Sequence, residues 1–165
     1  MTGSATTAIH GREAREKPYH SLVTPICTSS TFTFENMDDV RRMQEEYLGG
    51  KYLERQEYGR YGNPTQYVTE QRLAALEGAE AAILVASGMY AITASLLALL
   101  SNGDHMILTN DCYRRSRGFC STYLSRWGVE TTMVPACDIA AIEKALRPNT
   151  KVVSVSYTHL RAHET

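Results

Sequence analysis

Short apolar runs alternate with helical runs through the second half of the chain. Strands are predicted at 81–85, 105–109, 130–134 and from 151 onward, with helices at 89–100, 113–127 and 138–146. This alternation is typical of βαβ units, whose parallel strands are covered by helices on both faces. The predicted class is therefore α/β, with a mostly parallel, helix-flanked sheet. Since no helix follows the last predicted strand, we expect the sheet to be incomplete.

The sequence before the sheet predicts an N-terminal arm. Residues 1–62 are expected to be largely irregular, apart from a helix at 38–47 that ends at glycines 49 and 50. The segment 21–32 is rich in hydroxyl and β-forming side chains, but Pro25 excludes a central strand. We therefore expect an extended arm there.

The clearest helix signal in the sequence lies at 63–78. Asn63 is suited to be the N-cap, and Pro64 can occupy the first helical position because its missing N–H is not needed there. Gly78 is suited to end the helix in a left-handed conformation.

The final segment, 155–165, is unlike the sequence before it. It resembles the translation of a transposase-type sequencing adapter, an ending found in metagenomic gene fragments. We therefore expect the natural sequence to stop near Val153 or Ser154. His159 and His163 have the spacing of a helical metal pair, but we expect them to be accidental residues. The predicted organisation is thus an arm at 1–62, an incomplete α/β domain at 63–154 and a non-native tail at 155–165.

Composition excludes several classes of partner. Seventeen basic and eighteen acidic residues give a net charge of −1, so no strong field attracts nucleic acid or an anionic membrane. The longest apolar stretch, 91–100, is far shorter than the roughly 20 residues that span a bilayer. Residues 1–17 lack the apolar middle of a secretory signal, so a cytoplasmic location is expected.

The cysteines indicate neither a metal site nor a disulfide framework. They are widely scattered, without a CxxC pair or a closely spaced histidine, at Cys27, Cys112, Cys120 and Cys137. We expect reduced and mostly packed thiols.

One candidate phosphate site is the turn formed by Ser87, Gly88 and Met89. It joins the predicted strand at 81–85 to the helix at 89–100. A helix N-terminus offers free N–H groups and the positive end of the helix dipole. Gly88 would let the backbone approach a ligand closely, and Ser87 would add a hydroxyl donor. A Ser-Gly turn can also serve the backbone conformation alone.

A second candidate lies in the segment 58–65, where Arg60 follows Tyr58 by two residues. The planar guanidinium of arginine is well matched to phosphate. A solvated arginine in a glycine-rich turn is the alternative interpretation.

Tyr113 is a third candidate, because it follows the strand at 105–109 at the sheet edge shared with Ser87, Gly88 and Met89. Its ring could stack on a planar cofactor. It could equally be an ordinary residue at a helix start. The arginines that follow it, at positions 114, 115 and 117, add positive charge or form a solvated helix face.

Together these motifs resemble the Cys/Met-metabolism family of pyridoxal-phosphate enzymes, a fold-type-I group. This family includes cystathionine γ-synthase, cystathionine γ- and β-lyases and the homoserine-ester sulfhydrylases. The resemblance extends from about residue 7 to 153, with landmarks at 22–32, 58–65, 76–80, 87–89 and 111–114. The segment 111–117 is most similar to the cystathionine γ-synthase branch.

The resemblance implies pyridoxal 5'-phosphate as cofactor. Gly88 and Met89 would hold its phosphate through backbone amides, with Ser87 in the same turn, and Tyr113 would stack on the pyridine ring. Tyr58 and Arg60 would reach the phosphate of a neighbouring subunit, which implies a homodimer, usually within a homotetramer. The family commonly has serine where this chain has glycine 59, so one hydroxyl is missing.

The resemblance also implies that the catalytic lysine lies outside this chain. Family members are more than twice as long, and Lys144 and Lys151 come too early to be the Schiff-base lysine. We expect a fragment without catalytic residues of its own. It would come from an enzyme that replaces the γ-substituent of an activated homoserine with cysteine.

Other interpretations remain open at this point. Within the family, the protein could be an O-acyl-homoserine sulfhydrylase or a cystathionine γ- or β-lyase. From another class, it could be a non-catalytic phosphate-binding α/β module or an inert truncated chain. A dinucleotide-binding module is disfavoured, because the sequence contains no GxGxxG loop with an acidic residue about 20 positions later.

Overall fold

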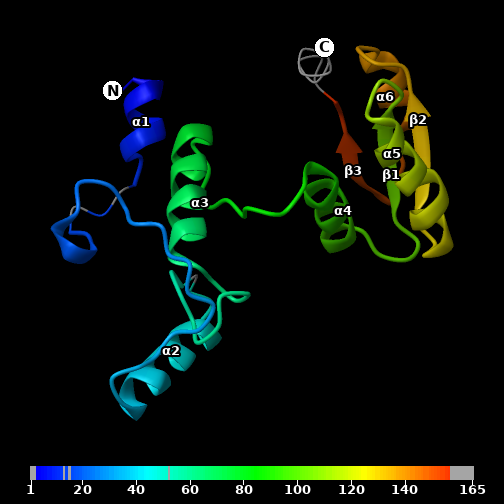
Figure 1. Cartoon of the computed structure of the whole chain (residues 1–165). Coiled ribbons are helices and arrows are strands. Elements are labelled where there is room, and N and C mark those ends of the chain that lie inside the picture. Colours follow the sequence, from blue (N-terminus) through cyan, green and yellow to red (C-terminus); the bar gives the residue numbers. More distant parts are fainter. Residues whose placement is uncertain (1–2, 13, 15, 52, 157–165) are drawn as a thin grey trace. The chain divides into compact units, whose positions relative to one another are not determined.

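The structure is a computed structural model that describes residues 3–12, 14, 16–51 and 53–156 (Figure 1). His159 and His163 and most of the expected non-native tail lie outside the described residues. The backbone contacts divide the chain into two compact units, 1–84 and 85–165. The helix that begins at Pro64 therefore belongs to the N-terminal unit, whereas the sequence placed the boundary after residue 62. The functional domain limits predicted above stay predictions.

Four helical elements lie in the described part of the N-terminal unit. They are α1 (Ser4–His10), the 3₁₀ helix η1 (Pro18–His20), α2 (Met37–Leu48) and α3 (Pro64–Glu77). Neither α1 nor η1 was expected from the sequence. A helix as short as α1 is marginal in isolation, but it packs along α3. A Cβ added at Gly11 would lie 2.8 Å from the Cβ of Ala75, so glycine is what permits this close approach.

The predicted caps of α3 are confirmed, and α2 ends at Gly49 as predicted, whereas its N-cap, Asn36, was not expected from the sequence. The side chain of Asn63 accepts a hydrogen bond from the amide of Thr65 at 2.9 Å, and Gly78 ends α3 with φ of 63°. At the start of α2, the side chain of Asn36 accepts from the amides of Asp38 and Asp39. These side chains satisfy N–H groups that a helix leaves without partners at its first turn.

The segment 21–32 contains no helix, in keeping with the predicted extended arm. Its one ladder contact within the described residues is an isolated antiparallel bridge between Thr31 and Tyr58. The arm is also tied to the start of α3. The amide of Cys27 donates to the hydroxyl of Thr65 at 2.8 Å, and the side-chain amide of Asn63 donates to the Cys27 carbonyl at 3.1 Å.

The strand predicted at 81–85 does not form, so that prediction is wrong. A strand needs a neighbour for its backbone N–H and C=O groups, and side chains of α3 take that place here. Glu70 is fully buried, and its carboxylate accepts from the amide of Leu84 at 2.7 Å. Gln66 donates to the Leu84 carbonyl at 3.2 Å.

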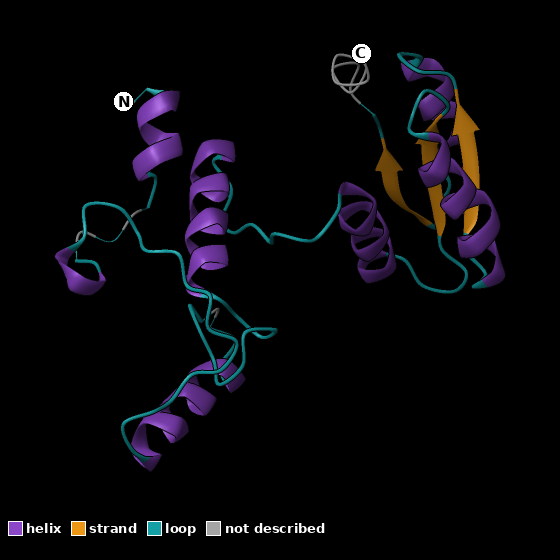
Figure 2. Cartoon of the chain, viewed as in Figure 1, coloured by secondary structure: helices purple, strands orange, loops and turns teal. Residues whose placement is uncertain are grey.

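The C-terminal unit contains the expected parallel sheet (Figure 2). Its strands are β1 (His105–Thr109), β2 (Glu130–Val134) and β3 (Thr150–Ser154), in the order β2-β1-β3. Both pairings are parallel, and every residue of β1 is buried. Its helices are α4 (Gly88–Leu99), α5 (Arg114–Gly118), the π-helix η2 (Phe119–Leu124) and α6 (Ile139–Ala145).

One face of the sheet forms the core of this unit. Alternate β1 residues point to opposite faces, and Met106 and Leu108 pack against apolar residues of α4 and η2. The buried cluster comprises Leu96, Leu100, Met106, Leu108, Cys120, Leu124 and Val129. Contact with α4 and η2 shields Met106 and Leu108 from water, whereas Met133 of β2, which pairs with Leu108, is half exposed.

The helix predicted at 113–127 forms, but with a π-helical segment in its middle. No sequence pattern indicated this change of hydrogen-bond pattern. The hydroxyl of Thr131 on β2 donates to the carbonyl of Cys120 at 3.3 Å, so part of the altered backbone bonds to the sheet. Such π turns are often found near functional sites.

Candidate cofactor site

The N-terminus of α4 presents two unpaired amides. Ser87 is the N-cap, with φ of −159° and ψ of 153°, and its Oγ accepts from the amide of Tyr90 at 3.1 Å. The amide of Ala91 donates to the Ser87 carbonyl at 3.0 Å. Within the described residues, the amides of Gly88 and Met89 donate to no acceptor. These are two of the donors that a phosphate needs at a helix N-terminus.

Gly88 leaves open space at this helix end. A Cβ built on it would meet no atom within 4 Å, and its φ is not in the left-handed region. Neither packing nor backbone strain within the described residues therefore requires glycine. The backbone at this helix end is therefore accessible from outside the described residues.

Tyr113 lies near this turn, because α4 packs against α5. Ser116, one turn after Tyr113, donates its hydroxyl to the thioether sulfur of Met89 at 3.7 Å and is almost fully buried. Tyr113 is the N-cap residue of α5, and its side chain is 52% exposed. A ring held at the edge and half open to solvent can stack on a planar heterocycle.

A pocket of about 310 Å³ opens beside Tyr113 at the carboxyl ends of β1 and β3. Its wall includes Tyr113, Ser116, Cys112, Cys120 and Ser156. Ligands of open parallel sheets bind at this edge of the strands. The pocket size lies at the lower end of the range for small-molecule sites.

The loop between β1 and α5 is held by Asn110, which the sequence did not single out. Its side-chain oxygen accepts from the amide of Ala136 at 3.3 Å, and its carbonyl accepts from the guanidinium of Arg117 at 3.0 Å. Arg117 is thus anchored to the loop and is not merely a solvated side chain. One carboxylate oxygen of Asp111 is buried and has no hydrogen-bond partner in the described part of the chain.

The two cysteines of the pocket are poor nucleophiles. Burial raises the pKa of the Cys120 thiol to about 11, with a further contribution from Cys112. Burial also raises the pKa of Cys112, partly opposed by the charge of Arg117. Since the thiolate is the reactive form, neither residue is suited to covalent catalysis. Cys120 is buried, Cys27 and Cys112 are partly buried and Cys137 is exposed, which agrees with the expectation of mostly packed thiols.

Tyr58 and Arg60 form a separate cluster in the N-terminal unit. The Arg60 guanidinium carbon lies 4.3 Å from the ring centroid of Tyr58 and 5.8 Å from that of Tyr61. These contacts are cation–π interactions that fix the cation without neutralising its charge. Across the residues that the structure covers, Arg60 has no hydrogen bond or ion pair. It is therefore available to an anion.

Residues 5–158 match the protein family described as Cys/Met metabolism PLP-dependent enzyme. The chain belongs to this family. The resemblance inferred from the sequence motifs is thereby confirmed, and so is pyridoxal 5'-phosphate as the cofactor of the family. Residues of this chain fit that cofactor at its phosphate, through the free amides of Gly88 and Met89.

Individual relatives carry different activities. The chain is 38% identical over 160 residues to cystathionine gamma-synthase 1, chloroplastic, of Nicotiana tabacum, covering 96% of this chain and 28% of that protein. It is 38% identical over 152 residues to L-methionine gamma-lyase of Treponema denticola, and the match covers 92% of this chain and 36% of that protein. The crystal structure of metB from Corynebacterium glutamicum is similar, with a TM-score of 0.77 and 33% sequence identity. The match covers 93% of this chain and 37% of that one.

These comparisons fix the family and the fold. The parallel, helix-flanked sheet is that of the family, and the chain spans only about a third of the three relatives named above, 28% to 37% of their length. No helix within the described ranges is long and apolar enough to cross a membrane. The roles of Ser87, Gly88, Met89, Tyr113, Tyr58 and Arg60 stay predictions.

Proposed function

We propose that this chain forms part of an enzyme that replaces the γ-substituent of an activated homoserine with cysteine. The observation that supports this most is the pair of free amides on Gly88 and Met89, next to the helix that begins at Tyr113. The N-terminus of α4 offers N–H donors for a phosphate. The start of α5 offers the ring of Tyr113, which can stack on an aromatic heterocycle. When bound, pyridoxal 5'-phosphate supplies the electron sink that γ-replacement needs.

The residues of this chain would bind and orient the cofactor. Gly88 and Met89 would donate their amides to the phosphate, and Ser87 could add its hydroxyl hydrogen because its oxygen already accepts from Tyr90. Tyr113 would limit the tilt of the ring. The contact between Ser116 and Met89 would fix the position of this turn relative to Tyr113.

Tyr58 and Arg60 would complete the site of a second subunit. Two features support this part of the proposal. The Arg60 charge is not neutralised by any described residue, and the Tyr58 ring holds the guanidinium in place. The full-length protein would then be a homodimer or a homotetramer, with amino-acid substrates.

The phosphate role of the α4 N-terminus can be tested with a matched pair of variants. Gly88→Pro removes one N–H donor at the helix position where proline fits best, and Ser87 already has the extended conformation that precedes proline. Gly88→Ala keeps the N–H, and its Cβ meets no protein atom. Since a hydrogen bond to a charged group contributes about 1.5–3 kcal/mol, we expect Gly88→Pro to weaken binding roughly tenfold or more.

The measurement is calorimetric titration of the chain with pyridoxine 5'-phosphate, which lacks the aldehyde and cannot react with lysines. Pyridoxine without the phosphate is the ligand control. Circular dichroism checks that both variants keep their helices. Equal affinity of Gly88→Pro and Gly88→Ala, or equal binding of pyridoxine and its phosphate, would contradict the proposed phosphate site.

The reaction itself is tested with the full-length protein that contains this chain. Incubation with cysteine and an activated homoserine should give cystathionine, identified by mass spectrometry. Product only when sulfide replaces cysteine would instead indicate a sulfhydrylase. Release of a 2-oxo acid and ammonia from cystathionine or methionine would indicate a lyase. Relatives at 38% identity include a synthase and a lyase, so identity does not decide among these outcomes.

A further inference from the structure

Arg55 carries a positive charge that the described residues do not neutralise. Its guanidinium carbon lies 5.7 Å from the ring centroid of Phe32 and 5.1 Å from that of Phe34. Its Nη1 is buried and has no hydrogen-bond partner. An aromatic face supports a cation only weakly, and a buried donor without an acceptor is costly. The Arg55 guanidinium therefore lacks an anionic partner among the described residues, and binding of an anion would stabilise it.

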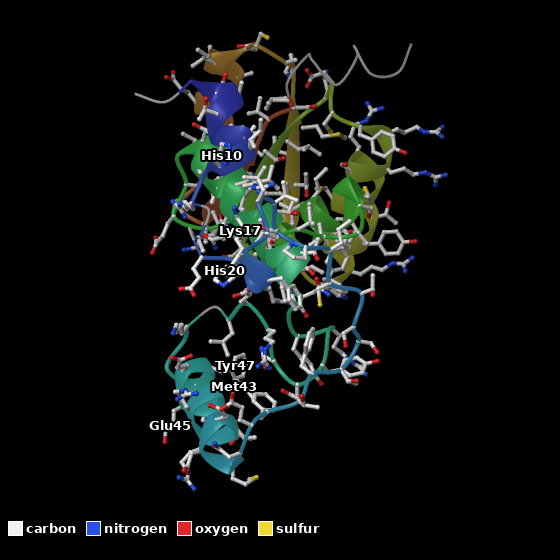
Figure 3. All side chains as sticks on the ribbon, turned by 60° about the vertical axis from the view of Figure 1, so that its left-hand side comes forward. His10, Lys17, His20, Met43, Glu45 and Tyr47 are labelled. Carbon is white, nitrogen blue, oxygen red and sulfur yellow. The ribbon has the colours of Figure 1, made fainter. Side chains whose placement is uncertain are left out.

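Arg55 lines a pocket of about 370 Å³ between α2 and the segment that follows it. We call it the Arg55 pocket. Its charged lining consists of Arg42, Lys51, Arg55, Asp39, Glu46 and Glu54. Met43 also lines it, and Figure 3 shows this residue on the side of α2 opposite Glu45. The pocket contains none of the six residues predicted to bind the cofactor.

Two of the three cations in the Arg55 pocket are already paired. Arg42 forms an ion pair with Asp39, and Lys51 forms one with Glu46 at 2.8 Å. Arg55 and Glu54 remain, and neither makes an ion pair or a side-chain hydrogen bond within the described ranges. They line the same pocket without pairing to each other. Among the described residues, the pocket thus offers one cation and one anion that have no ionic partner.

We propose that the Arg55 pocket binds a free α-amino acid with an apolar side chain. The α-carboxylate would bind the edge of the Arg55 guanidinium that faces the pocket. Because the charge is delocalised over this group, an anion at that edge also balances the share of the charge carried by the buried Nη1. The ammonium would bind Glu54, and the side chain would lie against Met43 and Leu53.

A zwitterion fits this lining better than a simple anion or a simple cation. An anion alone would lie near Asp39, Glu46 and Glu54 without an ammonium to balance them. A cation alone would leave Arg55 without an acceptor. The volume lies at the lower end of the range for small-ligand pockets, which suits a molecule of this size.

The experiment is calorimetric titration of the 165-residue chain, without cofactor, with L-leucine and with L-methionine. N-acetyl-L-leucine lacks the positive charge, and L-leucinamide lacks the negative one. We expect each blocked compound to bind at least about tenfold more weakly than L-leucine, since each loses one charged hydrogen-bonding group. No binding of either amino acid up to millimolar concentration would overturn the proposal.

Variants locate the binding in this pocket. Arg55→Gln and Glu54→Gln should each weaken the binding of L-leucine about tenfold or more. Glu54 is exposed, so its replacement leaves the fold intact and keeps the test valid if Arg55→Gln disturbs packing. Arg41→Gln is the control, because Arg41 lies on α2 and pairs with Asp38 outside the pocket. Unchanged affinity in Glu54→Gln would overturn the proposed ammonium partner and with it the zwitterion.

A macromolecular occupant would give a different result. If a carboxylate of a second copy fills the pocket, Arg55→Gln should change the association state of the chain in sedimentation, and free amino acids should not bind. That outcome would replace the proposal. Because no cofactor residue takes part, failure of this test leaves the proposed transsulfuration activity untouched.

Discussion

At the scale of single residues, His105 shows how a sheet accommodates a titratable group. It is fully buried at the start of β1 and lies between the hydroxyls of Thr150 and Thr132, each 2.8 Å from a ring nitrogen. Burial lowers its pKa below 6.5, and the nearby Arg147 lowers it further, against an opposing effect of Glu130. The folded sheet therefore favours the neutral imidazole.

This pKa predicts a loss of stability in weak acid. Above pH 6.5 the imidazole is neutral in both the folded and the unfolded chain. As the pH falls below 6.5, the unfolded chain binds a proton that the folded chain does not, so unfolding becomes easier. When unfolding takes up one proton, the free energy of unfolding falls by at most about 1.4 kcal/mol for each pH unit. Urea unfolding at pH 7.5 and 5.5 (about one unit either side of 6.5) measures this dependence.

His105→Asn should lose part of this pH dependence, because asparagine does not titrate. The control is His20→Asn, since His20 is exposed and lies in the other unit. An equal pH dependence in wild type and His105→Asn would show that the buried imidazole is not responsible.

At the scale of elements, local signals decided the ends of α3. Asn63, Pro64 and Gly78 act within one or two residues of their own position, so their roles follow from the sequence alone. The same is true of β1 and β2, whose apolar runs match the observed strands. The segment 81–85 has a similar apolar pattern but no available partner strand, and so it does not become a strand.

Two glycines on helices should respond in opposite ways to alanine. Both have open space for a Cβ, but Gly78 has φ of 63° and Gly118 has φ of −60°. Gly78→Ala should therefore destabilise the end of α3 by about 1 kcal/mol, because a Cβ disfavours the left-handed region. Gly118→Ala should stabilise its helix by about 0.5–1 kcal/mol. Hydrogen exchange of the amides in α3 and α5 reports both changes, and changes of the same sign would contradict this explanation.

At the scale of the whole molecule, the proposed site is shared between subunits. Ser87, Gly88 and Met89 would serve the cofactor of their own subunit, and Tyr58 and Arg60 that of a neighbour. In the full-length protein, Arg60→Ala and Gly88→Pro should each weaken cofactor retention. The reason is that each removes one donor to the same phosphate from a different chain.

Mixing the two variants tests this arrangement. A hybrid dimer has one site that carries both defects and one that carries neither. Subunits that are unfolded and refolded together should therefore recover cofactor retention and activity, whereas either variant refolded alone should not. No recovery in verified hybrids would mean that Tyr58 and Arg60 do not act across a subunit interface.

Local sequence patterns were enough to predict the family, the parallel α/β class, the caps of α3 and the candidate phosphate turn. These depend on spacing and on the conformational preferences of single residues. Three contacts could be found only in three dimensions: α1 packs against α3, Glu70 accepts from Leu84, and Ser116 contacts Met89. The same is true of the Arg55 Nη1, which has no hydrogen-bond partner among the described residues. Such contacts join residues far apart in the chain, and no local propensity encodes which side chain will satisfy which buried group.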